Sequence, residues 1–346
     1  FGTVENIVRQ EIASVWLAKF VKTATQIEKR NLLQRKHNMK ILGIGNAIVD
    51  VICKIEDKFL EENGLTKSTM KLVNENEFKK LLGNLKIEKT ISGGSVANSI
   101  VGLSQLGNKV GFIGKVNDDD LGRKYLEGLE KERVKFHYNI KSEKMPTGTC
   151  LILITPDSER TMCTFLGTAG KINENDIDEE IIKQSEITFL EGYLWDKGDP
   201  QKAFNKAINN SKQSAMSLSD LFCVERHKEF FLDLVQKKLS ITFANEQEII
   251  ALINAKDFSE VVEFAKKIKK LIIITRGENG AIAIHDDNVV ESSAKKGLEI
   301  KDLTGAGDLF AAGFLHGYVN KLSIKESLEK GTELSTKIIQ QVGARL

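Results

Sequence analysis

The stretch Asp302-Leu-Thr-Gly-Ala-Gly-Asp308, which continues as Leu309-Phe-Ala-Ala-Gly-Phe-Leu-His-Gly-Tyr318, is the most informative segment of this chain. It places two glycines around one alanine, directly before an acidic residue, and the apolar run that follows is long enough for a buried helix. We therefore predict a helix that begins at this turn. The unpaired amides and the dipole of a helix N-terminus favour the binding of an anion there.

Asp308 is the candidate catalytic residue of this segment. It lies in or beside the first turn of the predicted helix, where its carboxylate can face the same point as the amides of Gly305, Ala306 and Gly307. Amides that bind negative charge, next to a carboxylate that accepts a proton from a hydroxyl, are what phosphoryl transfer to an alcohol requires. The alternative is that the glycines only allow close packing and that Asp308 only caps the helix. Such a short motif does not decide between the two.

Two polar residues, Asn46 and Asp50, follow the predicted strand that starts near Lys40. Ile48 stands where a dinucleotide-binding G-x-G-x-x-G motif needs its third glycine, so the segment disfavours an oxidoreductase. Polar groups at the end of a buried strand lie where open α/β sheets bind ligands. A turn made by Asn and Asp is the alternative.

The segment Ser92-Gly93-Gly94-Ser95-Val-Ala-Asn98 predicts a second helix that opens at a glycine pair. Asn98 lies one turn inside this helix, on the face that Gly94 leaves open, so a small polar substrate could press against the backbone. The alternative is an ordinary loop with a helix cap.

Strand-like and helix-like segments alternate over most of the chain, and this predicts a parallel sheet covered by helices on both faces. Residues 147–155 and 160–165 are typical of a hairpin, with Arg160 at its returning edge, where a guanidinium could meet anionic substrate groups. An exposed strand arginine is the alternative. A last helix is expected from Ser323 to Gln341.

Two further motifs follow predicted strands. Asn245 and Glu248 are three residues apart at a helix start and could hold a hydrated Mg²⁺ through water, although the same spacing also fits a capping box. The strand that ends at Thr275 runs into a turn that contains Gly277 and Gly280. This turn could receive a nucleotide or could only connect two strands.

The composition excludes several function classes. A chain of 346 residues can bury a full core as one large domain, or as one domain with a smaller piece. The 50 basic and 48 acidic residues give a formal net charge of +2, which suggests neither nucleic-acid nor membrane binding. Four cysteines stand far apart without a C-x-x-C pair, so neither zinc nor disulfides are indicated, and we expect a cytoplasmic location.

Residues 1–38 differ from the sequence that follows. They carry seven Lys or Arg against three Glu and are typical of a partly amphipathic helix. Because Met39 directly precedes the first predicted strand, we expect the fold to begin there and residues 1–38 to be an extension outside it. A transit peptide is the alternative, which the three glutamates disfavour.

The motifs G-x-G-N…D, G-G-S-x-x-N, N-x-x-E, T-R-G-x-x-G and D-x-T-G-A-G-D occur in this order over about residues 40–343. With them the sequence resembles the ribokinase-type carbohydrate kinase family, also called the phosphofructokinase B type. Five motifs in one order are far more specific than any one of them. The segments 191–196 and 218–227 look like bacterial members that are usually assigned as adenosine kinases or general sugar kinases.

The resemblance implies a doubly wound α/β kinase domain over residues 39–346 with a small β lid from about 51–56, 69–73, 87–91 and 147–165. It implies Asp308 as the base and residues 305–307 as the anion hole. For the acceptor it implies Asn46, Asp50, Gly93, Gly94 and Asn98, to which we add Arg160. For ATP it implies Asn245, Thr275, Gly277, Gly280 and Thr304, and for Mg²⁺ it implies Asn245 and Glu248.

The function implied is transfer of the γ-phosphoryl of ATP to the 5′-hydroxyl of adenosine or a similar ribonucleoside. A ribokinase- or fructokinase-type sugar kinase is the near alternative, and a nucleoside-binding regulator without turnover is a different class. The helix dipole and Mg²⁺ are expected to lower the pKa of Asp308, which a loose transition state tolerates. We expect a small-molecule substrate and a monomer or a homodimer paired through the lid.

Overall fold

A nine-stranded sheet forms the centre of the described structure. The computed structural model describes residues 39–157 and 159–346, so the extension predicted for residues 1–38 lies outside the described residues. The strands of this sheet are β1 (Ile41–Ile44), β5 (Val110–Ile113), β6 (Lys135–Phe136), β9 (Ile187–Glu191), β10 (Ser214–Ser217), β11 (Ile241–Asn245), β12 (Leu271–Thr275), β13 (Ala281–His285) and β14 (Asn288–Ser292).

The order of the strands is that of a doubly wound sheet. From edge to edge it is β14-β13-β12-β11-β10-β9-β1-β5-β6. The pairs from β12 to β6 are parallel, and only β13 and β14 are antiparallel additions at one edge. The winding reverses between β1 and β9, and such switch points are where open α/β sheets bind ligands. The predicted fold class is confirmed.

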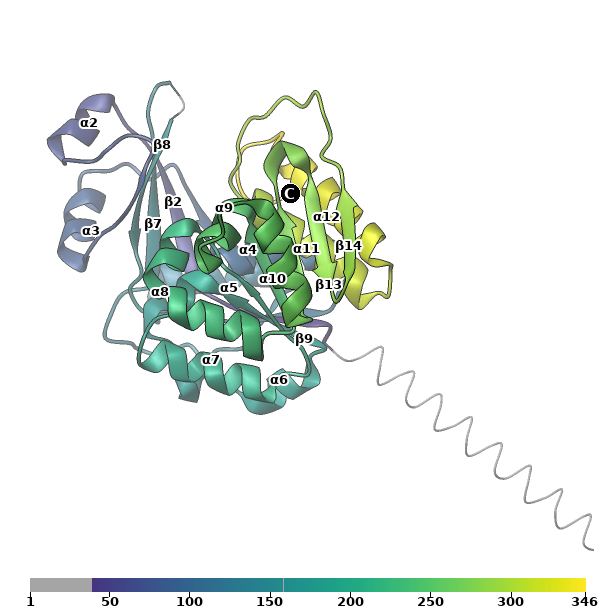
Figure 1. The fold of residues 1–346 in the computed structure, drawn as a ribbon. Helices are drawn as coiled ribbons and strands as arrows, with labels where there is room; N and C mark the ends of the chain where they lie inside the picture. Colours follow the sequence, from purple (N-terminus) through teal and green to yellow (C-terminus); the bar gives the residue numbers. More distant parts are fainter. Residues whose placement is uncertain (1–38, 158) are drawn as a thin grey trace, which may run out of the picture. The chain divides into compact units, whose positions relative to one another are not determined.

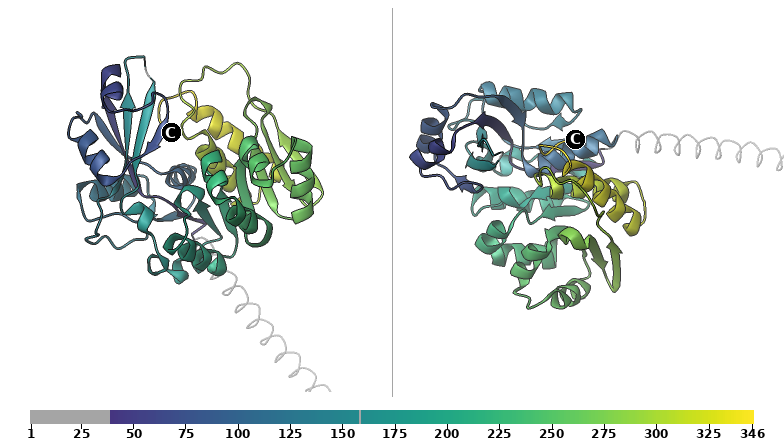
Figure 2. Two further views of the ribbon diagram at one scale, coloured as in Figure 1. Left: turned by 60° about the vertical axis from the view of Figure 1, so that its left-hand side comes forward. Right: turned by 90° about the horizontal axis from the view of Figure 1, so that it is seen from above.

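Helices cover both faces of this sheet (Figures 1 and 2). One face packs against α4 (Ser95–Gln105), α5 (Asp120–Lys131), α11 (Ala306–Val319) and α12 (Ile324–Ile338). The other packs against α6 (Glu179–Gln184), α7 (Asp199–Asn210), α8 (Leu221–Asp233), α9 (Glu246–Ile253) and α10 (Phe258–Ile268). Within the described residues, no helix combines the length and the apolar character needed to cross a membrane.

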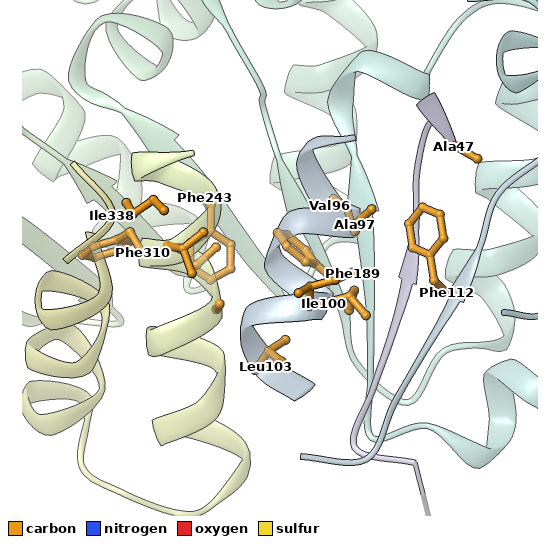
Figure 3. Packing of buried hydrophobic residues seen from close by; sticks show 14 of the residues in the cluster. Ala47, Val96, Ala97, Ile100, Leu103, Phe112, Phe189, Phe243, Phe310 and Ile338 are labelled. Carbon is orange, nitrogen blue, oxygen red and sulfur yellow. The ribbon is translucent and has the colours of Figure 1, made fainter. Parts of the chain in front are cut away.

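The core on the α4 face holds the helices that carry the glycine turns. Val96, Ala97 and Ile100 of α4 are fully buried between the sheet and α11. Figure 3 shows this layer, with Phe189 from the sheet near α4 and Phe310 from α11 beyond it. Burial of a Val, Ile or Phe side chain in this layer contributes roughly 1.5–3 kcal/mol to the free energy of folding. The packing therefore fixes the N-termini of α4 and α11 at the carboxyl ends of the strands.

A second sheet of five strands, in the order β3-β8-β7-β2-β4, stands beside the first. Its strands are β2 (Ile48–Lys54), β3 (Met70–Leu72), β4 (Lys89–Ser92), β7 (Gly148–Ile154) and β8 (Arg160–Phe165), and α2 (Asp57–Glu62) and α3 (Glu75–Leu82) accompany it. β7 and β8 pair antiparallel, as expected for the predicted hairpin. Phe78 of α3 stacks on Phe165 at 5.2 Å between ring centroids, so α3 covers one face of this sheet.

The helix predicted at the Asp308 motif is confirmed as α11, but the last helix is shorter than expected. α12 begins after Ser323, whose side chain and that of Glu326 form a capping box, and it ends at Ile338 instead of Gln341. After α12 the backbone turns back toward Asp302, where the amides of Lys301 and Asp302 donate to the carbonyl of Ile339. These bonds use an acceptor at the helix end and so end the helix early.

α11 and α12 approach so closely that glycine is required at their contact. A β-carbon on Gly313 would lie 2.3 Å from the carbonyl oxygen of Lys330, which is far inside van der Waals contact. Because that neighbour is backbone, it cannot turn aside as a side chain would. The two helices can pack at this distance only without a side chain at position 313.

We predict that Gly313→Ala lowers the free energy of unfolding by about 1–3 kcal/mol, because the helices must separate. Gly83→Ala is the matched control: Gly83 is exposed at the end of α3, has a φ of −63°, and its added β-carbon would come no closer than 3.3 Å to any atom. The control should stay within about 0.5 kcal/mol of wild type in urea denaturation. Equal stability of both variants would contradict this account of the contact.

Candidate active site

A cavity of about 570 Å³ lies between the second sheet and the carboxyl ends of the main-sheet strands. Apolar side chains of the second sheet form one wall, among them Ile48, Met70 and Met162. The cavity brings together most of the residues that the sequence analysis singled out, namely Asn46, Asp50, Gly94, Asn98, Asn245, Glu248, Thr275, Thr304, Gly305, Ala306, Gly307 and Asp308. Its polar groups therefore gather at the switch point of the sheet.

The turn before α11 lines this cavity with Gly305, Ala306 and Gly307. Gly305 has a φ of +80° and its added β-carbon would lie 2.8 Å from Ala344, so glycine is required there. The amide of Ala306 donates to the carbonyl of Leu303 at 3.2 Å. The amides of Gly305, Gly307 and Asp308 have no hydrogen-bond partner in the part of the chain that the structure describes. These three, and not Ala306, are the donors available to an anion.

The Asp308 carboxylate is held by two residues of α4. Ser95 donates its hydroxyl to Oδ1 at 2.6 Å, and Asn98 donates its Nδ2 to Oδ2 at 3.0 Å. Ser95 and Asn98 are three residues apart and so share one face of the helix. Their two bonds fix the direction in which the carboxylate points, and each oxygen keeps a lone pair for a further donor.

The pKa of Asp308 is raised in this structure, whereas the sequence analysis expected it to be lowered. Burial raises it to about 6, and this outweighs the hydrogen bonds from Ser95 and Asn98 and the charge of Arg345, which lower it. The expectation of a lowered pKa rested on the helix dipole and bound Mg²⁺ and did not count desolvation, which raises the pKa here. Asp308 is consequently a stronger base than a solvent-exposed aspartate.

Asp50 faces the cavity from β2. Burial raises its pKa to about 7, while Arg345 opposes the shift and Asp308 adds to it. Gly93 lies next to the Asp50 carboxylate and does not line the cavity. A β-carbon added to Gly93 would lie 2.5 Å from Oδ2 of Asp50, so glycine leaves room for this carboxylate. Gly94, with a φ of +100°, then begins α4. The glycine pair thus makes space for a carboxylate on one side and starts a helix on the other.

Glu191, at the end of β9, is a site residue that the sequence analysis did not assign. It is 1% exposed, and its carboxylate accepts from Asn46 Nδ2 at 2.8 Å and from the amide of Val96 at 3.0 Å. Burial raises its pKa to about 7. An acidic residue directly after the apolar strand Ile187–Leu190 was the signal that could have found it.

The pair Asn245 and Glu248 forms the capping box that was the alternative to a metal site. The amide of Glu248 donates to Asn245 Oδ1 at 2.8 Å, and the amide of Asn245 donates to Glu248 Oε2 at 2.9 Å. Asn245 Nδ2 also donates to Glu248 Oε1 at 2.7 Å. Burial raises the pKa of Glu248 to about 7. Both residues line the cavity, so the cap does not remove them from the site.

Arg160 is not brought into the cavity lining. Its guanidinium instead pairs with Asp302, with Nη1 2.6 Å from Oδ2, and so joins β8 to the loop before α11. The guanidinium that was expected to meet anionic substrate groups is thus paired with the carboxylate of Asp302. Gly277 and Gly280 also lie outside the lining and form the turn between β12 and β13. This is the strand connection named as the alternative to a nucleotide-binding turn.

Arg345 is a second residue that sequence reasoning missed. It donates from Nε to Asn98 Oδ1 at 3.0 Å, across 247 positions of sequence. Tyr193 and Phe222, both partly exposed, also line the cavity and were not assigned. No local pattern marks these residues, since their place depends on how distant segments pack.

Comparisons with known proteins identify the family. The model of the pfkB family carbohydrate kinases matches residues 64–346. The crystal structure of adenosine kinase from Sinorhizobium meliloti is 36% identical, with a TM-score of 0.81, and the match covers 89% of this chain and 96% of that one. A probable sugar kinase from Rhizobium etli CFN 42 is 33% identical, with a TM-score of 0.80, over 89% and 95%.

Curated relatives point the same way. Adenosine kinase of Schizophyllum commune is 27% identical over 345 residues, which is 88% of this chain and 96% of that protein. A 5-dehydro-2-deoxygluconokinase of Clostridium botulinum is 28% identical over 75% of this chain and 81% of its own length. The chain therefore belongs to the pfkB family of carbohydrate kinases, whose adenosine and sugar kinases are phosphotransferases that act on an alcohol group.

Proposed function

We propose that this chain transfers the γ-phosphoryl group of ATP to the 5′-hydroxyl of adenosine or a similar ribonucleoside. The observation that carries the proposal is the arrangement of Asp308, whose carboxylate shares a cavity with the unpartnered amides of Gly305 and Gly307. A proton acceptor and a group of anion-binding amides are thereby directed at one volume. Both are needed when an alcohol attacks a phosphoryl group.

In the proposed reaction Asp308 accepts the proton of the acceptor hydroxyl as its oxygen forms the bond to the γ-phosphorus. The bond between that phosphorus and the β,γ-bridging oxygen breaks, and ADP leaves with the electron pair. The amides of Gly305, Gly307 and Asp308 stabilise the charge on the transferred group. With a pKa of about 6, Asp308 is mostly ionised at neutral pH and ready to accept a proton.

We propose that Mg²⁺ binds at this site through an outer contact. Among the described residues, no group of three or more His, Cys, Asp or Glu side chains could hold a metal ion. Asn245 and Glu248 offer oxygen atoms at the cavity but are bonded to each other, so we propose that they hold the hydrated ion through water. When bound with ATP, Mg²⁺ supplies positive charge that neutralises the phosphates. Thr275 and Thr304 also line the cavity, and we propose that they contact ATP.

For the acceptor we propose that Asp50 and Asn46 bind the ribose hydroxyls. A carboxylate can accept two hydrogen bonds from a vicinal diol, and the carboxylate of Asp50 faces the cavity. The apolar wall of Ile48, Met70 and Met162 supports a nucleoside, since it offers a surface for a base. A sugar acceptor is the second candidate, which the similarity to a probable sugar kinase supports.

We further propose that residues 39–346 are the kinase domain and that the second sheet acts as a lid on the acceptor. The segments concerned are those predicted, about 51–56, 69–73, 87–91 and 147–165. Side chains of β2, β3, β7 and β8 line the cavity, so movement of this sheet would change access to it. Closing over bound substrates would exclude water from the reacting phosphate.

The decisive experiment measures ADP release by the purified chain with ATP, Mg²⁺ and a panel of acceptors. Adenosine, guanosine, inosine, ribose and fructose distinguish a nucleoside kinase from a sugar kinase. The proposal expects the highest kcat/KM for adenosine or a close ribonucleoside. Turnover of ribose or fructose alone would assign the chain to the second candidate, and no turnover of any acceptor would overturn the proposed activity.

We predict that Asp308→Asn lowers kcat by about 100-fold or more and leaves KM nearly unchanged, because only proton transfer in the transition state is lost. Asp199→Asn is the control, since Asp199 is an exposed residue at the start of α7. It should keep wild-type kinetics. A kcat for Asp308→Asn within a few-fold of wild type would remove Asp308 from this role.

Asp50→Ala is expected to raise KM for the acceptor, because the carboxylate that would hold two hydroxyls is removed. The loss of one charged hydrogen-bonding group corresponds to roughly 10-fold in KM. KM for ATP should not change, and Asp57→Ala, at an exposed position on α2, should alter neither constant. Equal acceptor affinity in wild type and Asp50→Ala, measured by isothermal titration, would contradict the assignment.

The raised pKa values predict the pH profile. Asp308 must be ionised to accept a proton, and its pKa is about 6. Asp50, at about 7, must be ionised to accept two hydroxyls. Both active forms are lost as the pH falls, so kcat/KM should be level above about pH 8 and decline toward about pH 5. A profile that stays flat down to about pH 5 would show that neither carboxylate titrates in this range.

A further inference from the structure

Arg345 lies in the segment that follows α12 and packs against the turn of the anion-binding amides. The contacts that hold this segment include a hydrogen bond from the amide of Gly343 to Asp302 Oδ2 at 2.8 Å and the packing of Ala344 beside Gly305. The Arg345 side chain then reaches α4, while its Nη2 atom is buried without a hydrogen-bond partner among the described residues. The family roles proposed above leave this guanidinium without a function.

The contacts of Asn98 show what the guanidinium does. Arg345 Nε donates to Asn98 Oδ1 at 3.0 Å, and Asn98 Nδ2 donates to Asp308 Oδ2 at 3.0 Å. An amide has one accepting and one donating end. A cation on one side and a carboxylate on the other allow only one orientation, since a flipped amide would direct its oxygen at Asp308 and its N–H groups at Arg345.

We propose that Arg345 is a positioning residue of the acceptor site: its guanidinium fixes the Asn98 amide so that an N–H group is directed at the Asp308 carboxylate. The role rests on the proposed function, in which Asp308 accepts the proton. Arg345 acts through Asn98, and so its effect on the reaction is to keep one oxygen of Asp308 bound and the carboxylate in a fixed direction.

Arg345 also affects the pKa values of the carboxylates around it. Its guanidinium interacts electrostatically with Asp308 of α11, Asp50 of β2, Tyr125 of α5 and Glu132, which directly follows α5. Burial raises the pKa values of Asp50 and Asp308, and Arg345 opposes that rise in both. Removing the guanidinium should therefore raise both pKa values further, whereas a residue that only fills space would leave them as they are.

The test compares Arg345→Gln and Arg345→Lys with wild type, and uses Arg123→Gln as the matched control. Arg123 is a half-exposed arginine of α5 that pairs with Asp118 and Asp120 and does not line the cavity. Arg345→Gln should lower kcat by about 10-fold, the effect of one charged hydrogen bond, while KM for ATP stays within about twofold. It should also move the acid limb of kcat/KM to higher pH.

Arg345→Lys separates the two parts of the role. It keeps the charge, so the acid limb should stay near its wild-type position, while the loss of the fixed N–H geometry should still reduce kcat. A double-mutant cycle with Asn98→Ala tests the route of the effect. If Arg345 acts through Asn98, the loss in the double variant should be about that of Asn98→Ala alone. Full additivity of the two losses would overturn the proposal.

Unfolding of the free protein tests the contact independently of turnover. Asp50 and Asp308 have folded pKa values above their unfolded ones, so they contribute stability at low pH that is lost as the pH rises. Arg345→Gln should therefore lose more stability relative to wild type at about pH 8 than at about pH 5.5, and Arg123→Gln should lose the same at both. An equal loss for Arg345→Gln at both would overturn the proposal, whereas an inactive wild type would overturn only the proposed activity.

Discussion

The hydrogen bonds from Ser95 and Asn98 to the Asp308 carboxylate are the interaction on which the arrangement of the site depends. They join the first turns of α4 and α11, two helices that lie side by side on one face of the sheet. Gly102 permits this closeness, because its added β-carbon would lie 2.9 Å from Leu309. The two glycine-rich turns thus meet at one end of the strands, and neither would form a site alone.

The same closeness concentrates negative charge where solvent is excluded. Asp50, Glu191 and Asp308 all have pKa values raised by burial, to about 7, about 7 and about 6. Groups of this kind lower the stability of the folded state at neutral pH and persist where a ligand or a function requires them. Asn46 and the amide of Val96 stabilise the ionised form of Glu191 by donating hydrogen bonds to it. The positive charge of Arg345 stabilises the ionised form of Asp308.

Local sequence was sufficient for the fold class and for the groups at strand and helix ends. The alternation of strand-like and helix-like segments predicted the sheet, and the Gly-Ala-Gly-Asp turn predicted the start of α11. Both features depend only on residues that are neighbours in the sequence. Local sequence was not sufficient for contacts and pKa values that depend on residues far apart in the chain. Asp302 pairs with Arg160 across 142 positions, and the pKa of Asp308 depends on burial that no local motif records. For Asn245 and Glu248, the N-x-x-E spacing fits a cap and a metal site equally.

β1 ends at Ile44 and β2 begins at Ile48, so three residues carry the chain from one sheet to the other. Asn46 is the middle one, and it is anchored to Glu191 of β9 by a bond of 2.8 Å. The chain also passes between the sheets after β4, β6 and β8, so this connector is one of several. Because Asn46 lines the cavity, a change in the angle between the sheets that altered the backbone torsions of residues 45–47 would also displace a group that faces a ligand.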